Sequence, residues 1–313
     1  MRSKIARTLP VLLGVGLLLG VAHWVGADAL RESLSTALGW LPLLFALEGV
    51  RVPLEALATR RLLGPLAPRV PLLTLARVQL VFYAVSTCAP GGRVLAEASK
   101  AALLASFVGA PASSAVATAS QAASLVADAL VAALGAGAVY ALCGFTRLTG
   151  LTLLFVIACA SLAALVAAAT RSSFSPRVLL RFPRLARFLE GWRRAARAQR
   201  LFDSRVVGLL FVARLAQVMM LGAALAAGGA GFAPLRALAL TALVMASAVV
   251  GEAIPAQLGA TDAVLVAAAP SLGVGLTHAA TVAVLFHVVQ LAWAAVGAMA
   301  GALAPGRPAT ARV

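Results

Sequence analysis

The sequence predicts an all-α polytopic membrane protein with about eight transmembrane helices and two further broken or re-entrant segments, arranged as a pseudo-repeat. Of the 313 residues, 62% are hydrophobic and only 12% are charged. Soluble domains are closer to half apolar and a quarter charged, so a soluble globule is excluded. The apolar runs are continuous and do not alternate with polar residues, which excludes a transmembrane β-barrel.

The net positive charge lies in four segments, and their position predicts how the chain crosses the membrane. The net charge is +16, and all of it lies in residues 1–8, 58–70, 171–205 and 305–313. Basic loops stay on the cytoplasmic side of a membrane. We therefore expect a multi-pass protein of the cell (inner or plasma) membrane with both termini in the cytoplasm.

The same charge pattern divides the chain into two halves. We expect one integral membrane domain over residues 1–313, with half 1 at about 9–170 and half 2 at about 206–304. The cytoplasmic basic loop 171–205 separates them.

The first apolar run, Leu9–Gly26, follows a basic start and is predicted to be a membrane helix. A cleaved signal peptide is the alternative, because Ala27-Asp28-Ala29 resembles a cleavage site. The charged stretch Asp28–Thr36 is expected outside the membrane.

Two further helices precede the first break. A helix from Leu38 to about Leu57 carries three charged residues on one face, Glu48, Arg51 and Glu55. A third helix begins at Pro71 and carries Arg77. Both helices therefore bring charge into the membrane.

The first broken segment, Ala89–Pro111, is the stretch on which the functional hypothesis depends. It opens with Pro90, Gly91 and Gly92, and a helical face with Arg93, Glu97 and Lys100 follows. A second segment, Ile254–Val274, repeats the plan with Pro255, Gly259 and Asp262, and in both the acid follows the proline by seven residues.

Two such segments in matching halves of an apolar chain indicate a site of interrupted helices at mid-membrane. We expect Glu97 and Asp262 to lie on segments that face one polar cavity, and the helix starts after Pro90 and Pro255 to offer free N–H groups to a phosphate. Two ordinary helix starts with an early proline remain the alternative.

The rest of the first half predicts two helices. Residues 112–142 form an Ala- and Ser-rich helix with Gln121 and Asp128 on one face, and Leu148–Ala169 is a fifth apolar run. An even number of crossings is needed to return the chain to the cytoplasm, so the segment after Pro90 must itself recross the membrane.

The basic loop is predicted to contain an interfacial amphipathic helix with affinity for anionic headgroups. Its apolar face is Leu185, Phe188, Leu189 and Trp192, with arginines around it. Nucleic-acid binding is the alternative for a basic run, but aromatic residues are too few and the flanks are membrane segments; we expect no nucleic-acid partner.

The second half is predicted to repeat the plan. Helices are expected at Val206–Ala227, which carries Arg214, at Phe232–Val250, and from about Thr277 to Leu303. Glu252 follows the second of them. Gly297 and Gly301 form a GxxxG motif that favours helix packing over a dimer, although a homo-oligomer stays open.

No motif for an enzyme is found. The chain lacks GxSxG, HExxH, a complete GxGxxG and a Walker motif, and its cysteines and histidines lack metal-binding spacing. We therefore expect no enzymatic activity, no cofactor and no metal.

The charges that remain within the spans cost about 2.5–3.5 kcal/mol each at the bilayer centre unless they pair or face water. A plain helix–helix ion pair is the alternative for any one of them.

The pattern resembles the membrane region of lysylphosphatidylglycerol synthases, a family of flippase-like integral membrane proteins. The residues that carry the resemblance are the run from Pro90 to Lys100, the run from Gln121 to Asp128, and the run from Pro255 to Asp262. Glu97 lies two residues further from its proline than is usual for the family, Lys100 replaces Arg, and Asp262 replaces Glu. The chain ends at Val313 soon after its last predicted helix, so we expect no soluble aminoacyl-transferring domain.

The resemblance implies a flippase-like transporter that moves a phospholipid or lipid-linked substrate across the cytoplasmic membrane, with anionic membrane lipids as partners. The candidate headgroup-binding residues are Arg51, Arg77, Pro90, Gly91, Gly92, Arg93, Glu97, Lys100, Gln121, Asp128, Arg214, Glu252, Pro255, Gly259 and Asp262. Two alternatives are a small-molecule or proton-coupled secondary transporter, and a non-transporting scaffold that recruits lipid or a partner through its basic loop.

Overall fold

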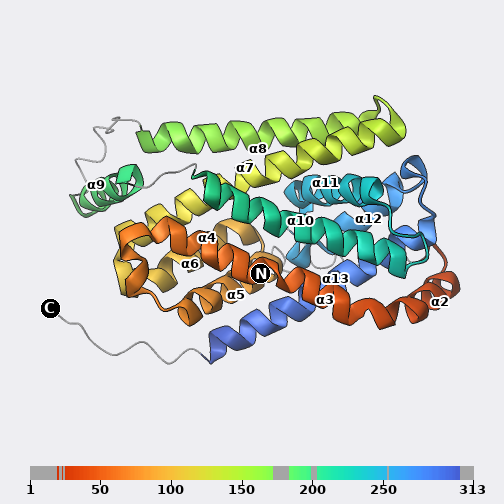
Figure 1. The fold of residues 1–313 in the computed structure, drawn as a ribbon, viewed down its shortest axis with the longest axis horizontal. Coiled ribbons are helices and arrows are strands. Elements are labelled where there is room, and N and C mark those ends of the chain that lie inside the picture. The colour runs from red at the N-terminus through yellow and green to blue at the C-terminus, as the bar shows by residue number, and fades with distance from the viewer. Residues whose placement is uncertain are drawn as a thin grey trace, which may run out of the picture.

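The protein is a bundle of helices in the part of the chain that the computed structural model describes, which is residues 20, 23, 25–171, 183–198, 203–251 and 254–303 (Figure 1). The first half contains α2 (Ala27–Ala37), η1 (Leu38–Trp40), α3 (Leu41–Gly49), α4 (Arg51–Leu63), η2 (Gly64–Arg69), α5 (Leu72–Cys88), α6 (Gly92–Val108), α7 (Ala110–Cys143) and α8 (Arg147–Arg171). The second half contains α9 (Pro183–Ala198), α10 (Ser204–Ala227), α11 (Pro234–Gly251), η4 (Pro255–Gln257), α12 (Ala260–Ala268), η5 (Pro270–Leu272) and α13 (Leu276–Ala302).

The predicted all-α membrane class is confirmed. Five of the described helical stretches are long and apolar enough to cross a membrane: Asp28–Arg69, Ala110–Cys143, Arg147–Arg171, Ser204–Ala227 and Leu276–Ala302. Leu72–Cys88 and Pro234–Val249 are shorter apolar helices. The longest single helix, α7, has 34 residues and so measures about 50 Å, more than the hydrocarbon core of about 30 Å. Most of the predicted first span, Leu9–Gly26, lies outside the described residues.

Both predicted breaks are present, but their local structures differ. After α5 the chain turns through Gly91, whose φ of 65° is left-handed and suits a residue without Cβ, and α6 begins at once. After Pro255 the chain takes a short 3₁₀ turn in which Ala256 and Gln257 have positive φ angles of 55° and 54°, and α12 begins only at Ala260. The segments are therefore alike in sequence and unlike in backbone.

The single helix predicted from Leu38 to Leu57 is two helices. The chain forms α3, breaks at Val50 and continues as α4 to Leu63, six residues beyond the predicted end. Pro53 explains the break, because it has no N–H to donate and its ring crowds the carbonyl of Gly49, four residues earlier.

The helices of the two halves pack against each other rather than as separate units. In Figure 1, α7 and α8 lie side by side along one edge, and α13 runs beside α5 from the other half. One apolar cluster surrounds Phe286 and Leu243, a second surrounds Leu75 and Leu104, and a third lies around Phe155. A polar cavity lies where residues of all three clusters meet.

The glycine pair at the end of α13 serves helix packing, as the sequence predicted. A Cβ on Gly297 would collide with the backbone carbonyl of Leu80 on α5, so the two backbones are in direct contact. We expect Gly297→Ala to lower the free energy of unfolding by about 1–3 kcal/mol, because α5 and α13 must move apart. Gly137→Ala on α7 is the control, since its Cβ would meet nothing within 4 Å. Equal unfolding free energies for both variants, measured by denaturant titration in detergent, would contradict this close contact.

The predicted amphipathic helix is present as α9, beside the start of α7 and the end of α8 (Figure 1). Part of its apolar side packs on the protein: Trp192 Nε1 donates a hydrogen bond to Thr118 Oγ1 at 3.4 Å, and Gly191 lies close to Pro111. Leu185 is 45% exposed at the other end of the helix. The apolar face is therefore shared between α7 and the surroundings.

Candidate functional site

A polar cavity of about 220 Å³ lies inside the bundle. Its wall contains side chains from α4, α5, α6, α7, α8, α10, α11, η4 and α13, so both halves of the chain build it. Seven of the residues predicted from the sequence line it: Arg51, Arg93, Glu97, Lys100, Gln121, Asp128 and Arg214. Four of these are cations and two are acids, and Glu55 adds a third acid.

One end of the cavity is built by α4 and α5, whose Arg51 and Tyr83 bind Glu48 on α3. Arg51 donates through Nη1 to Glu48 Oε1 and through Nη2 to Glu55 Oε1, the latter at 3.5 Å. These residues lie on one face because they are three and four positions apart. Tyr83 on α5 donates to Glu48 Oε1 at 2.8 Å, and Gln79 on the same helix donates to Glu55 Oε2.

The other end is built by α6, α7 and α10 around the carboxylate of Asp128. Arg214 Nε donates to Asp128 Oδ1 at 2.6 Å, and Arg93 Nη2 donates to Oδ2 at 2.8 Å. Gln121 Oε1 accepts from Arg93 Nε at 3.2 Å. The Asp128 side chain is 2% exposed, so two guanidinium groups balance a carboxylate that is shielded from water.

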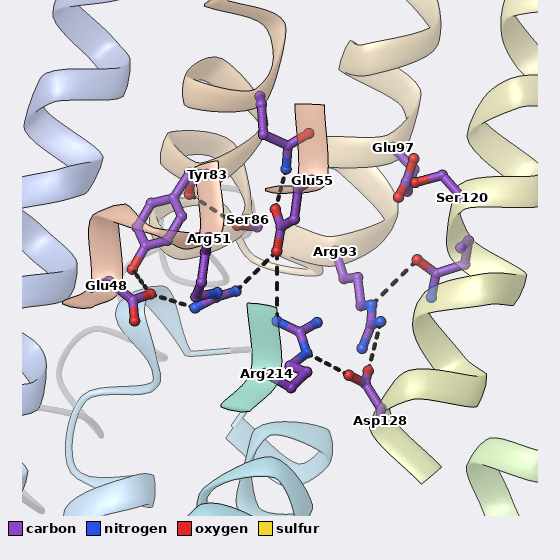
Figure 2. A network of polar contacts seen from close by, with 12 residues as sticks. Glu48, Arg51, Glu55, Tyr83, Ser86, Arg93, Glu97, Ser120, Asp128 and Arg214 are labelled. Atoms are coloured by element: carbon purple, nitrogen blue, oxygen red, sulfur yellow. Dashed lines mark hydrogen bonds and ion pairs between the residues drawn. The ribbon is translucent and has the colours of Figure 1, made fainter. Parts of the chain in front are cut away.

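Arg214 joins the two ends. Its Nη1 lies 3.7 Å from Glu55 Oε1, which is the longest link in the series. The result is one alternating chain of charges, Glu48, Arg51, Glu55, Arg214, Asp128 and Arg93, which Figure 2 shows as a continuous run of dashed lines. The charges of the three acids and the three cations cancel, so this series of ion pairs places six charged groups in the bundle without a net charge.

A second ion pair lies beside this chain on α6. Lys100 Nζ donates to Glu97 Oε1 at 3.2 Å and to Ser120 Oγ at 3.0 Å, and it lies 4.1 Å from the centroid of the Phe82 ring. Lys100 is 2% exposed. Glu97 Oε2 is buried and has no hydrogen-bond partner among the described residues, so Glu97 has unused capacity to accept a hydrogen bond next to the cavity.

The remaining predicted site residues that the structure describes do not line the cavity. Arg77 donates to the carbonyl of Leu303 at 3.3 Å on the outer side of α5. Five residues, Pro90, Gly91, Gly92, Pro255 and Gly259, shape the two turns but are absent from the cavity wall. Glu252 lies outside the described residues.

Both predicted segments reach the cavity, Ala89–Pro111 through Glu97 and Ile254–Val274 through Gln257, but the Asp262 side chain does not line it. Gln257 of the second segment lines the cavity, whereas Asp262 does not and is buried, with 1% exposure. Asp262 lies in the first turn of α12, where its Oδ2 accepts from the backbone N–H of Gly259 at 2.7 Å. At the start of α12 the carboxylate of Asp262 therefore already takes up one backbone N–H that was expected to be free for a phosphate.

Several cavity residues were missed as site candidates. Tyr83, Gln79 and Gln217 are uncharged residues in apolar helices, and a polar residue within a span was the signal that could have found them. Glu48 and Glu55 were recognised as charges on one face but not as site residues, and Glu55 was not recognised as a partner of Arg214. His287, the partner of Asp262, was considered only as a metal ligand. No group of three His, Cys, Asp or Glu in the described ranges is arranged to hold a metal ion.

A helical membrane bundle with a charged cavity between its two halves defines the protein as a polytopic membrane protein with a buried polar site. Comparison with protein families matches residues 9–297 to the lysylphosphatidylglycerol synthase TM region. The chain belongs to this family, as its sequence motifs indicated. Comparisons with curated proteins and with solved structures found no match.

Proposed function

We propose that this protein is a lipid flippase-like transporter that lets the polar head of a phospholipid or lipid-linked substrate pass through the cavity. Family membership supports a role connected with lipids. The observation that carries the proposal is a cavity within the bundle in which four cations face an interior space. No chemical change of the lipid is part of the proposal.

Arg93 is the residue best placed to meet a phosphate. Its side chain is 34% exposed, whereas Arg214 is 15% and Lys100 3% exposed. Its Nε and Nη2 are bonded to Gln121 and Asp128, and its Nη1 has no hydrogen-bond partner among the described residues. A guanidinium group with a free N–H donor is suited to a phosphodiester, because it donates in a fixed plane.

The cavity also reaches the outside of the bundle. Val249, near the end of α11, lines the cavity and is 63% exposed. Together with Ile254 it gives this part of the wall an apolar character. Such an opening would let the headgroup enter the polar interior while the acyl chains stay in the hydrocarbon, which avoids transferring a charged group through lipid.

The proposed orientation places the basic segments in the cytoplasm, with α9 at the headgroup level of an anionic membrane. Four of the α9 arginines are Arg184, Arg187, Arg194 and Arg197. Each basic residue near an anionic surface contributes about 1 kcal/mol to its attraction.

We expect Arg93→Gln to reduce translocation of a fluorescent phospholipid in proteoliposomes by roughly tenfold or more, equivalent to about 1.4 kcal/mol in the barrier. The measurement is the fraction of labelled lipid that becomes accessible to a membrane-impermeant quencher over time. Arg147→Gln is the matched control, because Arg147 is an exposed arginine at the start of α8. It removes the same charge and should leave the rate unchanged.

The assay separates the proposal from its two alternatives. Wild-type proteoliposomes that move the lipid no faster than empty liposomes contradict lipid transport. Uptake of a polar solute by the same vesicles then favours a small-molecule transporter, and its absence favours a scaffold. Equal loss of rate in Arg93→Gln and Arg147→Gln contradicts a specific role for the cavity.

A further inference from the structure

A second buried polar pair, Asp262 and His287, lies behind the cavity. Their side chains are 1% and 5% exposed. His287 Nε2 and Asp262 Oδ2 are 3.0 Å apart, and the same Oδ2 accepts from the N–H of Gly259. The two other polar atoms, Asp262 Oδ1 and His287 Nδ1, are buried without a hydrogen-bond partner among the described residues. Unpartnered buried atoms of this kind are rare and call for an explanation.

The pair holds an uncompensated charge when the imidazole is neutral. A carboxylate bonded to a neutral imidazole leaves one buried negative charge, which is costly without a cation. The titratable side chains on the described elements packed against α12 and α13 are Asp28, Arg31, Glu32, Glu48, Arg77, Tyr83, Cys88, Arg205, Arg214, Arg236 and, on α13 itself, His278. None of them bonds to Asp262 or His287.

One added proton removes the charge. The proton binds at His287 Nδ1, the ring atom that has no partner among the described residues. The imidazole then becomes an imidazolium, and its contact with Asp262 becomes an ion pair. The only bond that forms is N–H, and the proton is taken from water and returned to it.

The pair is connected to the cavity through both chain segments that carry it. On α13, Phe286 and Gln290 line the cavity on either side of His287 in sequence. On the other segment, Asp262 binds the N–H of Gly259, the last residue of the turn in which Ala256 and Gln257 have left-handed backbone angles. Non-glycine residues in that region are strained and persist only when the surroundings hold them.

We propose that Asp262 and His287 form a proton-binding site that switches the turn 256–259 between two arrangements and so moves Gln257 in the cavity. In the proton-free pair Asp262 Oδ2 holds Gly259 N–H and with it the strained turn. The imidazolium competes for the same oxygen, which weakens the hold on Gly259 and lets the turn relax. This inference concerns proton binding and does not depend on the proposed lipid transport.

The site can be tested directly because the chain has three histidines, His23, His278 and His287. The full-length protein, labelled with ¹⁵N-histidine in lipid nanodiscs, is titrated while the ring nitrogen signals are recorded, with His287→Asn and His278→Gln for assignment. In parallel, hydrogen exchange of the peptide covering 254–262 is measured by mass spectrometry and corrected for intrinsic exchange.

The titration runs from about pH 8 down to about pH 5, and along it we expect the signals of the His287 ring to change from the neutral to the imidazolium pattern. Exchange of the turn should change at the same midpoint, and the step should disappear in His287→Asn and persist in His278→Gln. Should His287→Asn fail to fold, Asp262→Asn, whose amide oxygen can still accept from Gly259, replaces it.

A His287 ring that keeps one form across this range would overturn the proton site. A His287 ring that titrates while hydrogen exchange of the turn stays constant would overturn the switch. A pH-dependent step in exchange that persists in His287→Asn as well as in His278→Gln would overturn it too. Neither measurement requires transport, so a protein that fails in the lipid assay still gives a decisive result here.

Discussion

Replacing Asp128 by asparagine is expected to lower the free energy of unfolding by about 3–5 kcal/mol. Asp128 is the carboxylate to which Arg93 and Arg214 both bind, and its side chain is 2% exposed. Removing its charge leaves two guanidinium groups in the bundle, one without an acid and one with only the 3.7 Å contact to Glu55. The unfolding free energy of the variant, measured by SDS titration of the detergent-solubilised protein, gives the size of the loss.

The control for this prediction is Glu190→Gln on α9, the same chemical change in an exposed ion pair. Glu190 lies 2.9 Å from Arg194, and both side chains are mostly exposed. Solvent-exposed helix pairs contribute only about 0.3–0.5 kcal/mol. A double variant, Asp128→Asn with Arg214→Gln, should lose less than the two single changes together, because the residues share one interaction. Additive losses would show that Asp128 and Arg214 do not interact.

Helix positions and helix faces could be predicted from the sequence, because they depend on local signals. Apolar length gave the helices at 112–142 and 148–169 within a few residues of α7 and α8. Proline and glycine marked both breaks, and the spacing of Arg93, Glu97 and Lys100 placed them on one face. The break at Val50 was missed, although Pro53 supplied the signal.

Long-range partners could not be predicted, because they depend on how helices rotate and pack. Arg214 and Asp128 are 86 residues apart in the chain. Nothing in the sequence near either residue distinguishes this pairing from a pairing of Arg214 or Asp128 with another charged residue. The same holds for Asp262 and His287, which are 25 residues apart. The sequence showed that the charges require partners, and only the packing decides which.

The equivalence of Glu97 and Asp262 failed for a local reason. Both acids follow a proline by seven residues, but spacing in sequence equals position on a helix only where the helix begins at the same point. After Pro90 the helix starts at Gly92, so Glu97 lies in its second turn. In the second segment the 3₁₀ turn is formed by Pro255–Gln257, two more residues follow, and α12 starts at Ala260, so Asp262 lies in the first turn of α12 and caps it. The side chains therefore point to different surroundings.

Glu97→Gln is expected to lower both stability and translocation. Glu97 is the only acid bonded to Lys100 in the described part of the chain, and it lines the cavity. Neutralising it leaves a buried ammonium group held by Ser120 and the Phe82 ring alone. We expect a loss of about 3–5 kcal/mol in unfolding free energy. We also expect at least a roughly tenfold loss of lipid translocation, because the cavity gains a net positive charge that binds a phosphate too tightly to release it. Glu32→Gln, an exposed glutamate on α2, is the control.

Exchanging the two charges separates stability from function. Glu97→Lys combined with Lys100→Glu restores an ion pair at the same spacing on α6. Unfolding free energy should therefore recover by more than half of the loss caused by Glu97→Gln. In the wild-type protein Lys100 donates to Glu97 and to Ser120. The exchange moves the ammonium group from position 100 to position 97, so we expect translocation to stay low. Recovery of both properties would mean that the cavity needs only a balanced pair. Recovery of neither would mean that position 100, 2% exposed, cannot hold a carboxylate.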